Sequence, residues 1–178
     1  MRRLPVYFLI DTSFSMGGPP IEEMRVGLKE TVSALRQEPL CLETVHICVI
    51  TFANEATVVA PLTALGEFQI PKISAGGNSA LGAGLNLLAE CIETEIVYST
   101  AEVIGDWNPH VILMTNGRPS DDWHAGLARF KQHELDVCVA MAVGRHVRLD
   151  VLEQITADVV TSFDRRTLTS RMIKLWED

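Results

Sequence analysis

The chain has 178 residues, enough for one well-buried domain and short for two, so we expect a single domain over residues 1–178. Its net charge of −8 argues against a nucleic-acid partner, because binding to phosphates needs a basic surface. No apolar run approaches the ~20 residues that cross a bilayer, and the first residues lack a cleavable signal pattern. We therefore expect a cytoplasmic protein without membrane insertion.

Several apolar segments rich in β-forming residues predict strands. Four nearly continuous runs are typical of strands buried on both faces, and they cover residues 5–11, 44–53, 110–115 and 136–143. Residues 51–62 predict a tight turn at Asn54-Glu55 followed by a returning, antiparallel strand. Residues 157–163 predict a short last strand.

Helical patterns alternate with these strands. Apolar residues recur at helical spacing over residues 21–35, 81–92, 123–130, 149–155 and 166–176. This alternation predicts a doubly wound α/β fold, with a mostly parallel six-stranded sheet, one antiparallel edge strand and helices on both faces. Residues 97–109 are weakly patterned, so we expect a surface loop and keep it as a candidate contact surface.

The chain contains four widely spaced cysteines, and no two form a Cys-x-x-Cys pair. Cys48 and Cys138 lie in strand-like runs, and Cys91 lies on the apolar face of a predicted helix. We therefore expect buried free thiols rather than zinc ligands or disulfides.

Three polar clusters follow the predicted strands or open the helices. The first contains Asp11, Ser13 and Ser15, directly after the first strand. Ser79 lies in a glycine-rich turn before the second helix, and Asn116 follows the strand at 110–115. In an open α/β sheet, ligands bind beyond the carboxyl ends of the strands where the strand order reverses. The three clusters are therefore candidates for one site.

The pattern of these clusters excludes several kinds of site. A phosphate-binding P-loop, a dinucleotide fingerprint and the glycine-flanked serine of an acyl-transfer enzyme each need a motif that is absent. One carboxylate with several hydroxyls suits a hard divalent cation such as Mg²⁺. Ser13 and Ser15 are equally consistent with turn and helix-capping residues. The residues alone leave both interpretations open.

Three segments in order give the chain a resemblance to von Willebrand factor type A domains. "DTSFSM" (11–16) resembles the Asp-x-Ser-x-Ser motif of that family's metal-ion-dependent adhesion site. "GGNSALGAGL" (76–85) and "VILMTNGRPSDDW" (111–123) are similar to the family's second and third segments. The opening residues, "LTAL" (62–65) and "GRPSDDW" look specifically like the bacterial tellurium-resistance TerY-type subfamily.

The resemblance implies a strand order in which the first and fourth strands are neighbours. It also implies that Asp11, Ser13 and Ser15 hold a metal, Mg²⁺ or else Mn²⁺ or Ca²⁺, with Ser79 and Asn116 completing the shell. A carboxylate from a protein partner supplies the last ligand. Asn116 stands where the family has an aspartate, which removes one negative charge, so we expect a weakened site. A metal-free site is the alternative.

The resemblance implies a non-enzymatic protein-binding module in a tellurite or stress-response system, with a kinase or phosphatase of the same operon as a candidate partner. One alternative is a metal-assisted hydrolase or phosphatase, for which Asp121 and His124 are the candidate bases. Another is a scaffold phosphorylated at Thr12, Ser13 or Ser15. Phe14 is expected either to contact a partner or to pack against the loop at 97–109.

Overall fold

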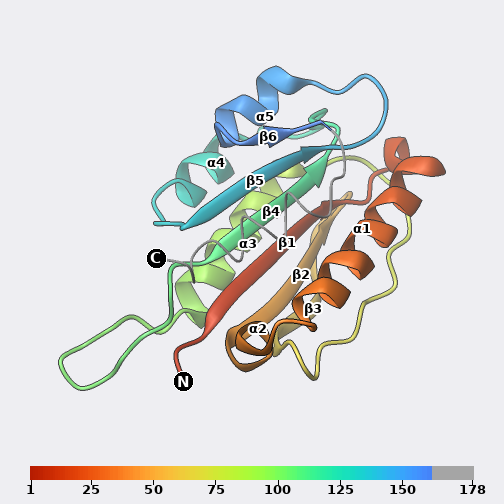
Figure 1. Cartoon of the computed structure of the whole chain (residues 1–178). Coiled ribbons are helices and arrows are strands. Elements are labelled where there is room, and N and C mark those ends of the chain that lie inside the picture. The colour runs from red at the N-terminus through yellow and green to blue at the C-terminus, as the bar shows by residue number, and fades with distance from the viewer. Residues whose placement is uncertain (162–178) are drawn as a thin grey trace.

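The computed structural model describes residues 1–161 and contains a six-stranded sheet in the order β3-β2-β1-β4-β5-β6 (Figure 1). All neighbouring strands are parallel except β2 and β3. The strands are β1 (Leu4–Asp11), β2 (Val45–Phe52), β3 (Ala56–Ala64), β4 (His110–Thr115), β5 (Val137–Ala142) and β6 (Val159–Val160). The predicted doubly wound fold with one antiparallel edge strand is confirmed.

Helices cover both faces of the sheet (Figure 1). They are α1 (Pro19–Leu35), α2 (Pro39–Thr44), α3 (Leu81–Glu95), α4 (His124–Phe130) and α5 (Leu149–Ile155), with a 3-10 turn, η1, at Phe14–Met16. No helix within residues 1–161 has the length and hydropathy needed to span a bilayer. The helix predicted at 166–176 lies outside the described residues, as do the last two residues of the strand predicted at 157–163.

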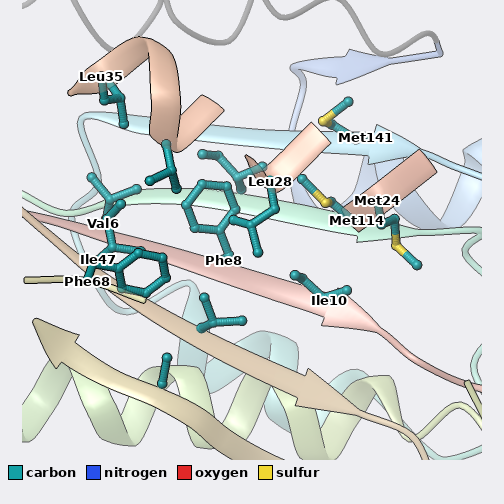
Figure 2. Close-up of a cluster of buried hydrophobic side chains, with 14 of the residues drawn as sticks. Val6, Phe8, Ile10, Met24, Leu28, Leu35, Ile47, Phe68, Met114 and Met141 are labelled. Carbon is teal, nitrogen blue, oxygen red and sulfur yellow. The ribbon is translucent and has the colours of Figure 1, made fainter. Parts of the chain in front are cut away.

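The central strand β1 is buried along its whole length because it contributes to two hydrophobic cores. Val6, Phe8 and Ile10 point to one face, where they pack with Met24 and Leu28 of α1 (Figure 2). The alternate residues belong to the opposite core, with α3, α4 and α5. This two-sided burial explains why β1 is an almost continuous apolar run rather than an alternating one.

Helix α2 is absent from the sequence-based prediction. It has six residues, too few to show a helical repeat of apolar side chains, and only Cys41 and Thr44 are buried. Pro39 occupies its first turn, where the missing N–H of proline costs nothing. All four cysteines are free as expected, although Cys138 is only partly buried.

The strand order reverses between β1 and β4. β1 leads through α1 to β2 on one side, whereas β4 lies on its other side and leads to β5. In the parallel register Ile10 pairs with Met114, so Asp11 and Thr115 end their strands side by side. The carboxyl edge of the sheet at this reversal is where a ligand site is expected.

Candidate functional site

Asp11, the last residue of β1, is the centre of the polar cluster. It is completely buried, with 0% of its surface exposed. Oδ1 accepts a hydrogen bond from Ser13 N at 2.9 Å, and Oδ2 accepts from Ser79 Oγ at 3.1 Å and Thr115 Oγ1 at 2.6 Å. Three donors replace the water that the buried carboxylate has lost, so its charge is stabilised by hydrogen bonds.

The other predicted site residues join the same network. Ser13 Oγ and Ser15 Oγ lie 3.1 Å apart, and Asn116 Nδ2 donates to Ser15 Oγ at 2.9 Å. The structure therefore brings together all five residues from three separate loops, namely Asp11, Ser13, Ser15, Ser79 and Asn116. Ser15 is exposed to solvent, whereas the other four are buried.

Asn116 has its amide orientation set by two partners. Its Oδ1 accepts a hydrogen bond from Arg118 N at 3.2 Å, so its NH₂ group faces Ser15. An aspartate here would bring a second carboxylate to the cluster, whereas the asparagine brings a donor. Asp11 is thus the cluster's single carboxylate among the five predicted residues.

Two residues of the network escaped sequence reasoning. Thr115 Oγ1 donates to Asp11 and also accepts from Gly117 N at 3.1 Å. Ser120 Oγ accepts from Ser79 N at 3.0 Å, and Ser120 N donates back to Ser79 O at 2.7 Å. The register of parallel strands could have revealed Thr115, which ends β4 beside Asp11. No pattern in the sequence points to Ser120.

The two candidate bases of a hydrolase have other partners. Asp121 caps the start of α3, where its Oδ1 and Oδ2 accept from Gly82 N at 3.0 Å and Ala83 N at 3.1 Å. Residue 82 must be glycine for this contact, because a Cβ atom there would lie 2.8 Å from Asp121 Oδ2. His124 is exposed and its Nδ1 lies 2.9 Å from Asp122 Oδ1. Neither side chain is arranged as a free general base.

Phe14 stands at the rim of the cluster and is 82% exposed. Its N donates to Gly77 O at 2.8 Å, and Gly76 N donates to Thr12 O at 2.8 Å. These two hydrogen bonds tie the loop after β1 to the glycine-rich loop before α3. The alternative in which Phe14 packs against the loop at 97–109 is wrong. Trp107 N donates to Arg3 O, which places that loop at the opposite, amino-terminal end of β1 (Figure 1).

A pocket of about 460 Å³ adjoins the loop after β4. Arg118, His124 and Arg148 are among its lining residues. Arg148 pairs with Asp150, whereas the Arg118 guanidinium donates to the backbone oxygen of His146. Arg118 contacts Asn116 through its backbone N–H, whereas its guanidinium binds His146.

The donor chemistry of the cluster limits the metals that would fit. Residues 1–161 contain no group of three or more His, Cys, Asp or Glu side chains that could hold a metal ion. The cluster instead offers one carboxylate and the hydroxyls of Ser13, Ser15 and Ser79. Mg²⁺ is commonly held by one or two carboxylates with waters filling the remaining positions. The residues thus fit a hard cation bound weakly, and they do not fit a zinc or copper centre.

The model of the von Willebrand factor type A domain matches residues 6–170. The chain belongs to this family. Domains of the family are typically adhesion or protein-interaction modules, and some of them depend on metal. Among curated proteins, none matches the chain.

Three solved structures share the fold at low identity. The chain is 14% identical to an aerotolerance-related membrane protein of Bacteroides fragilis, with a TM-score of 0.66, and 96% of it covers 97% of that chain. The chain is 14% identical to the pilus adhesin SpaC of Lactobacillus rhamnosus, with a TM-score of 0.71, and the alignment covers 98% of this chain and 30% of the adhesin. The chain is 15% identical to the manganese-loaded TRAP protein of Plasmodium vivax, with a TM-score of 0.66, and the alignment covers 96% of this chain and 72% of TRAP.

Proposed function

We propose that the chain is a protein-binding module that holds an acidic side chain of its partner through a weakly bound divalent cation. The gathering of four other predicted oxygen-bearing residues in one hydrogen-bonded network with buried Asp11, at the point where the strand order reverses, carries this proposal. Asp11, Ser13 and Ser15 would hold Mg²⁺, Mn²⁺ or Ca²⁺, with Ser79 and Asn116 beside them. When bound, the cation supplies an attraction for the partner's carboxylate.

The charge of the site supports an acidic partner. A divalent cation beside the single carboxylate of Asp11 keeps a net positive charge, whereas a second carboxylate at position 116 would neutralise it. The same loss of a carboxylate that weakens metal binding therefore strengthens the attraction for a carboxylate from outside. Phe14 offers the partner an apolar contact at the rim.

Binding is favoured over turnover by the environment of the candidate bases. Both carboxylate oxygens of Asp121 accept hydrogen bonds from the start of α3, and His124 is paired with Asp122. Turnover of para-nitrophenyl phosphate in the presence of Mg²⁺ or Mn²⁺ tests the hydrolase alternative. Activity that is lost in the Asp11→Asn variant would contradict a binding-only role.

The sequence resemblance to TerY-type proteins suggests a cytoplasmic tellurite or stress-response setting, with a kinase or phosphatase of the same operon as the partner. A second function, regulation by phosphorylation, is favoured by one observation. Ser15 is exposed, whereas Thr12 and Ser13 are buried, so Ser15 is the accessible acceptor of the three. A phosphate on Ser15 would lie beside Ser13 and Asn116 and would repel an acidic partner.

Thermal unfolding against Mg²⁺ and Mn²⁺ concentration tests metal binding. A dissociation constant of about 1 mM would stabilise the protein by about 1.4 kcal/mol at about 10 mM metal. For a chain of this size this corresponds to roughly 3–6 °C in Tm. We expect a larger shift for Asn116→Asp, a smaller one for Ser15→Ala and none for Asp11→Asn. If Asp11→Asn folds and responds as the wild type does, the site assignment is wrong.

A further inference from the structure

Ser79 is held in place by one residue of the loop after β4. Its N–H donates to Ser120 Oγ at 3.0 Å, and its carbonyl oxygen accepts from Ser120 N at 2.7 Å. A serine hydroxyl is one rotatable bond away from the backbone, so the position of the backbone decides what the hydroxyl can reach. Here it reaches Asp11 Oδ2 at 3.1 Å, and Ser79 is only 6% exposed. The contact between Ser79 and Asp11 therefore depends on Ser120.

Asp121, the next residue of that loop, caps α3 from outside the helix. The N-cap residue of α3 is Ala80, whose side chain cannot bind the free amide groups of the first turn. Asp121 fills this role, because its two carboxylate oxygens accept from Gly82 N at 3.0 Å and Ala83 N at 3.1 Å. Helices usually carry a capping side chain at the N-cap residue itself. The start of α3 is instead capped only when the loop after β4 is in place.

The start of α3 also meets α4 without room for side chains. A Cβ atom on Gly82 would lie 2.8 Å from both Asp121 Oδ2 and Trp123 Cα, and one on Gly126 would overlap the carbonyl oxygen of Gly82. The two helices therefore approach each other as closely as glycine allows. Because this contact leaves no slack, a shift of the loop after β4 would move the start of α3 and, with it, Ser79.

The charge of Asp121 affects a cation as well as the helix. An α-helix carries a partial positive charge of about +0.5 at its amino-terminal end. Helix α3 has 15 residues and begins two residues after Ser79, so this end lies beside the cluster and opposes a cation there. The carboxylate of Asp121 binds two amide groups of the same end and offsets their positive charge. A cation at Asp11 is therefore repelled less than it would be beside an uncapped helix.

We propose that Asp121 and Ser120 are positioning residues of the cation site, which hold the Ser79 hydroxyl against Asp11 and raise the affinity for the cation without touching it. This inference rests on the proposed function, because it concerns the same site. Side chains that orient the ligands of a metal commonly tune its binding in this way. The role differs from that of a general base, for which Asp121 is the candidate in a hydrolase.

Binding of Mn²⁺, followed by the relaxation of water protons, tests the role of Asp121. Asp121→Asn removes the charge and keeps one oxygen acceptor, and we expect it to raise the Mn²⁺ dissociation constant at least about threefold. The matched control is Asp122→Asn, which removes the same charge one residue later, where the carboxylate faces His124. It should bind Mn²⁺ as the wild type does. No change in Asp121→Asn, or an equal rise in both variants, overturns the proposal.

Amide hydrogen exchange without metal tests the positioning of Ser79. Ser120→Ala removes the acceptor of Ser79 N, so exchange at Ser79 should become at least about tenfold faster, whereas Ser120→Thr keeps a hydroxyl and should match the wild type. Exchange at Phe8, in the buried central strand, reports the stability of the whole fold and should be equal in all three proteins. Exchange at Ser79 that is unchanged in Ser120→Ala, or that rises equally at Phe8, overturns the proposal.

The Mn²⁺ measurement also separates this inference from the proposed function. A wild type that binds Mn²⁺ no better than Asp11→Asn contradicts the proposed function and this inference with it. A wild type that binds Mn²⁺ at Asp11, with unchanged binding in Asp121→Asn, contradicts this inference alone.

Discussion

Acidification should destabilise this protein through one buried histidine. His110, the first residue of β4, is 0% exposed, and neither ring nitrogen has a hydrogen-bond partner among the described residues. Burial lowers the pKa of its imidazole from 6.5 to about 4. The folded protein therefore keeps His110 neutral at a pH where the unfolded chain already binds a proton.

The size of the effect follows from these two pKa values. Because the unfolded state binds the proton first, stability falls as the pH drops from about 6.5 to about 4 and levels off below. The difference between the two values corresponds to about 3 kcal/mol of unfolding free energy. His110→Leu, which replaces the imidazole with an apolar side chain of similar size, should remove this loss. It should also stabilise the protein at neutral pH, because two unpaired buried nitrogens disappear.

Urea unfolding of wild type and His110→Leu at several pH values measures the difference directly. Other groups titrate identically in both proteins, so the gap between the two free energies isolates His110. The gap should widen by about 3 kcal/mol between pH 7 and pH 4. A gap that stays constant over this range would refute the burial of a neutral, unpartnered imidazole.

Three further changes test the site and the core. Thr115→Val removes a donor to buried Asp11 and should cost about 1–3 kcal/mol in urea unfolding, whereas Thr115→Ser should cost less; equal costs would argue against the hydrogen bond. Asp121→Ala removes the cap of α3, so it should lower the free energy of unfolding by about 1 kcal/mol and speed hydrogen exchange of the Gly82 amide. Exchange at Gly82 that is no faster than in the wild type would contradict the cap. Leu28→Ala in the α1 core should cost about 2–5 kcal/mol, and a cost below 1 kcal/mol would contradict its complete burial.

The fold was predictable because burial on both faces leaves a clear trace in the sequence. The continuous apolar run of β1 and the helical spacing in α1 and α3 follow from their position between two cores. The turn at Asn54-Glu55 likewise marked the antiparallel edge strand. Helix α2 left no such trace because it is shorter than two helical repeats.

The candidate site was predictable only in part. Asp11, Ser79 and Asn116 stand at strand ends or in a glycine-rich turn, and chain order alone places such positions at one edge of a sheet. The contacts of Ser120 with Ser79 and of Asp121 with α3 depend on how the loop after β4 packs against α3. Contacts of this kind exist only in the folded molecule, so a single sequence does not reveal them.

Paramagnetic broadening by Mn²⁺ tests the central claim most directly, because it locates the cation as well as detecting it. In amide proton NMR spectra, signals of residues 12–16, Ser79 and residues 116–118 should broaden first, while those of residues 97–106 at the opposite edge stay sharp. The Asn116→Asp variant should show the same pattern at lower Mn²⁺ concentration, because a second carboxylate tightens binding. Broadening that spares these residues, or that is unchanged in Asp11→Asn, would contradict a cation site at Asp11.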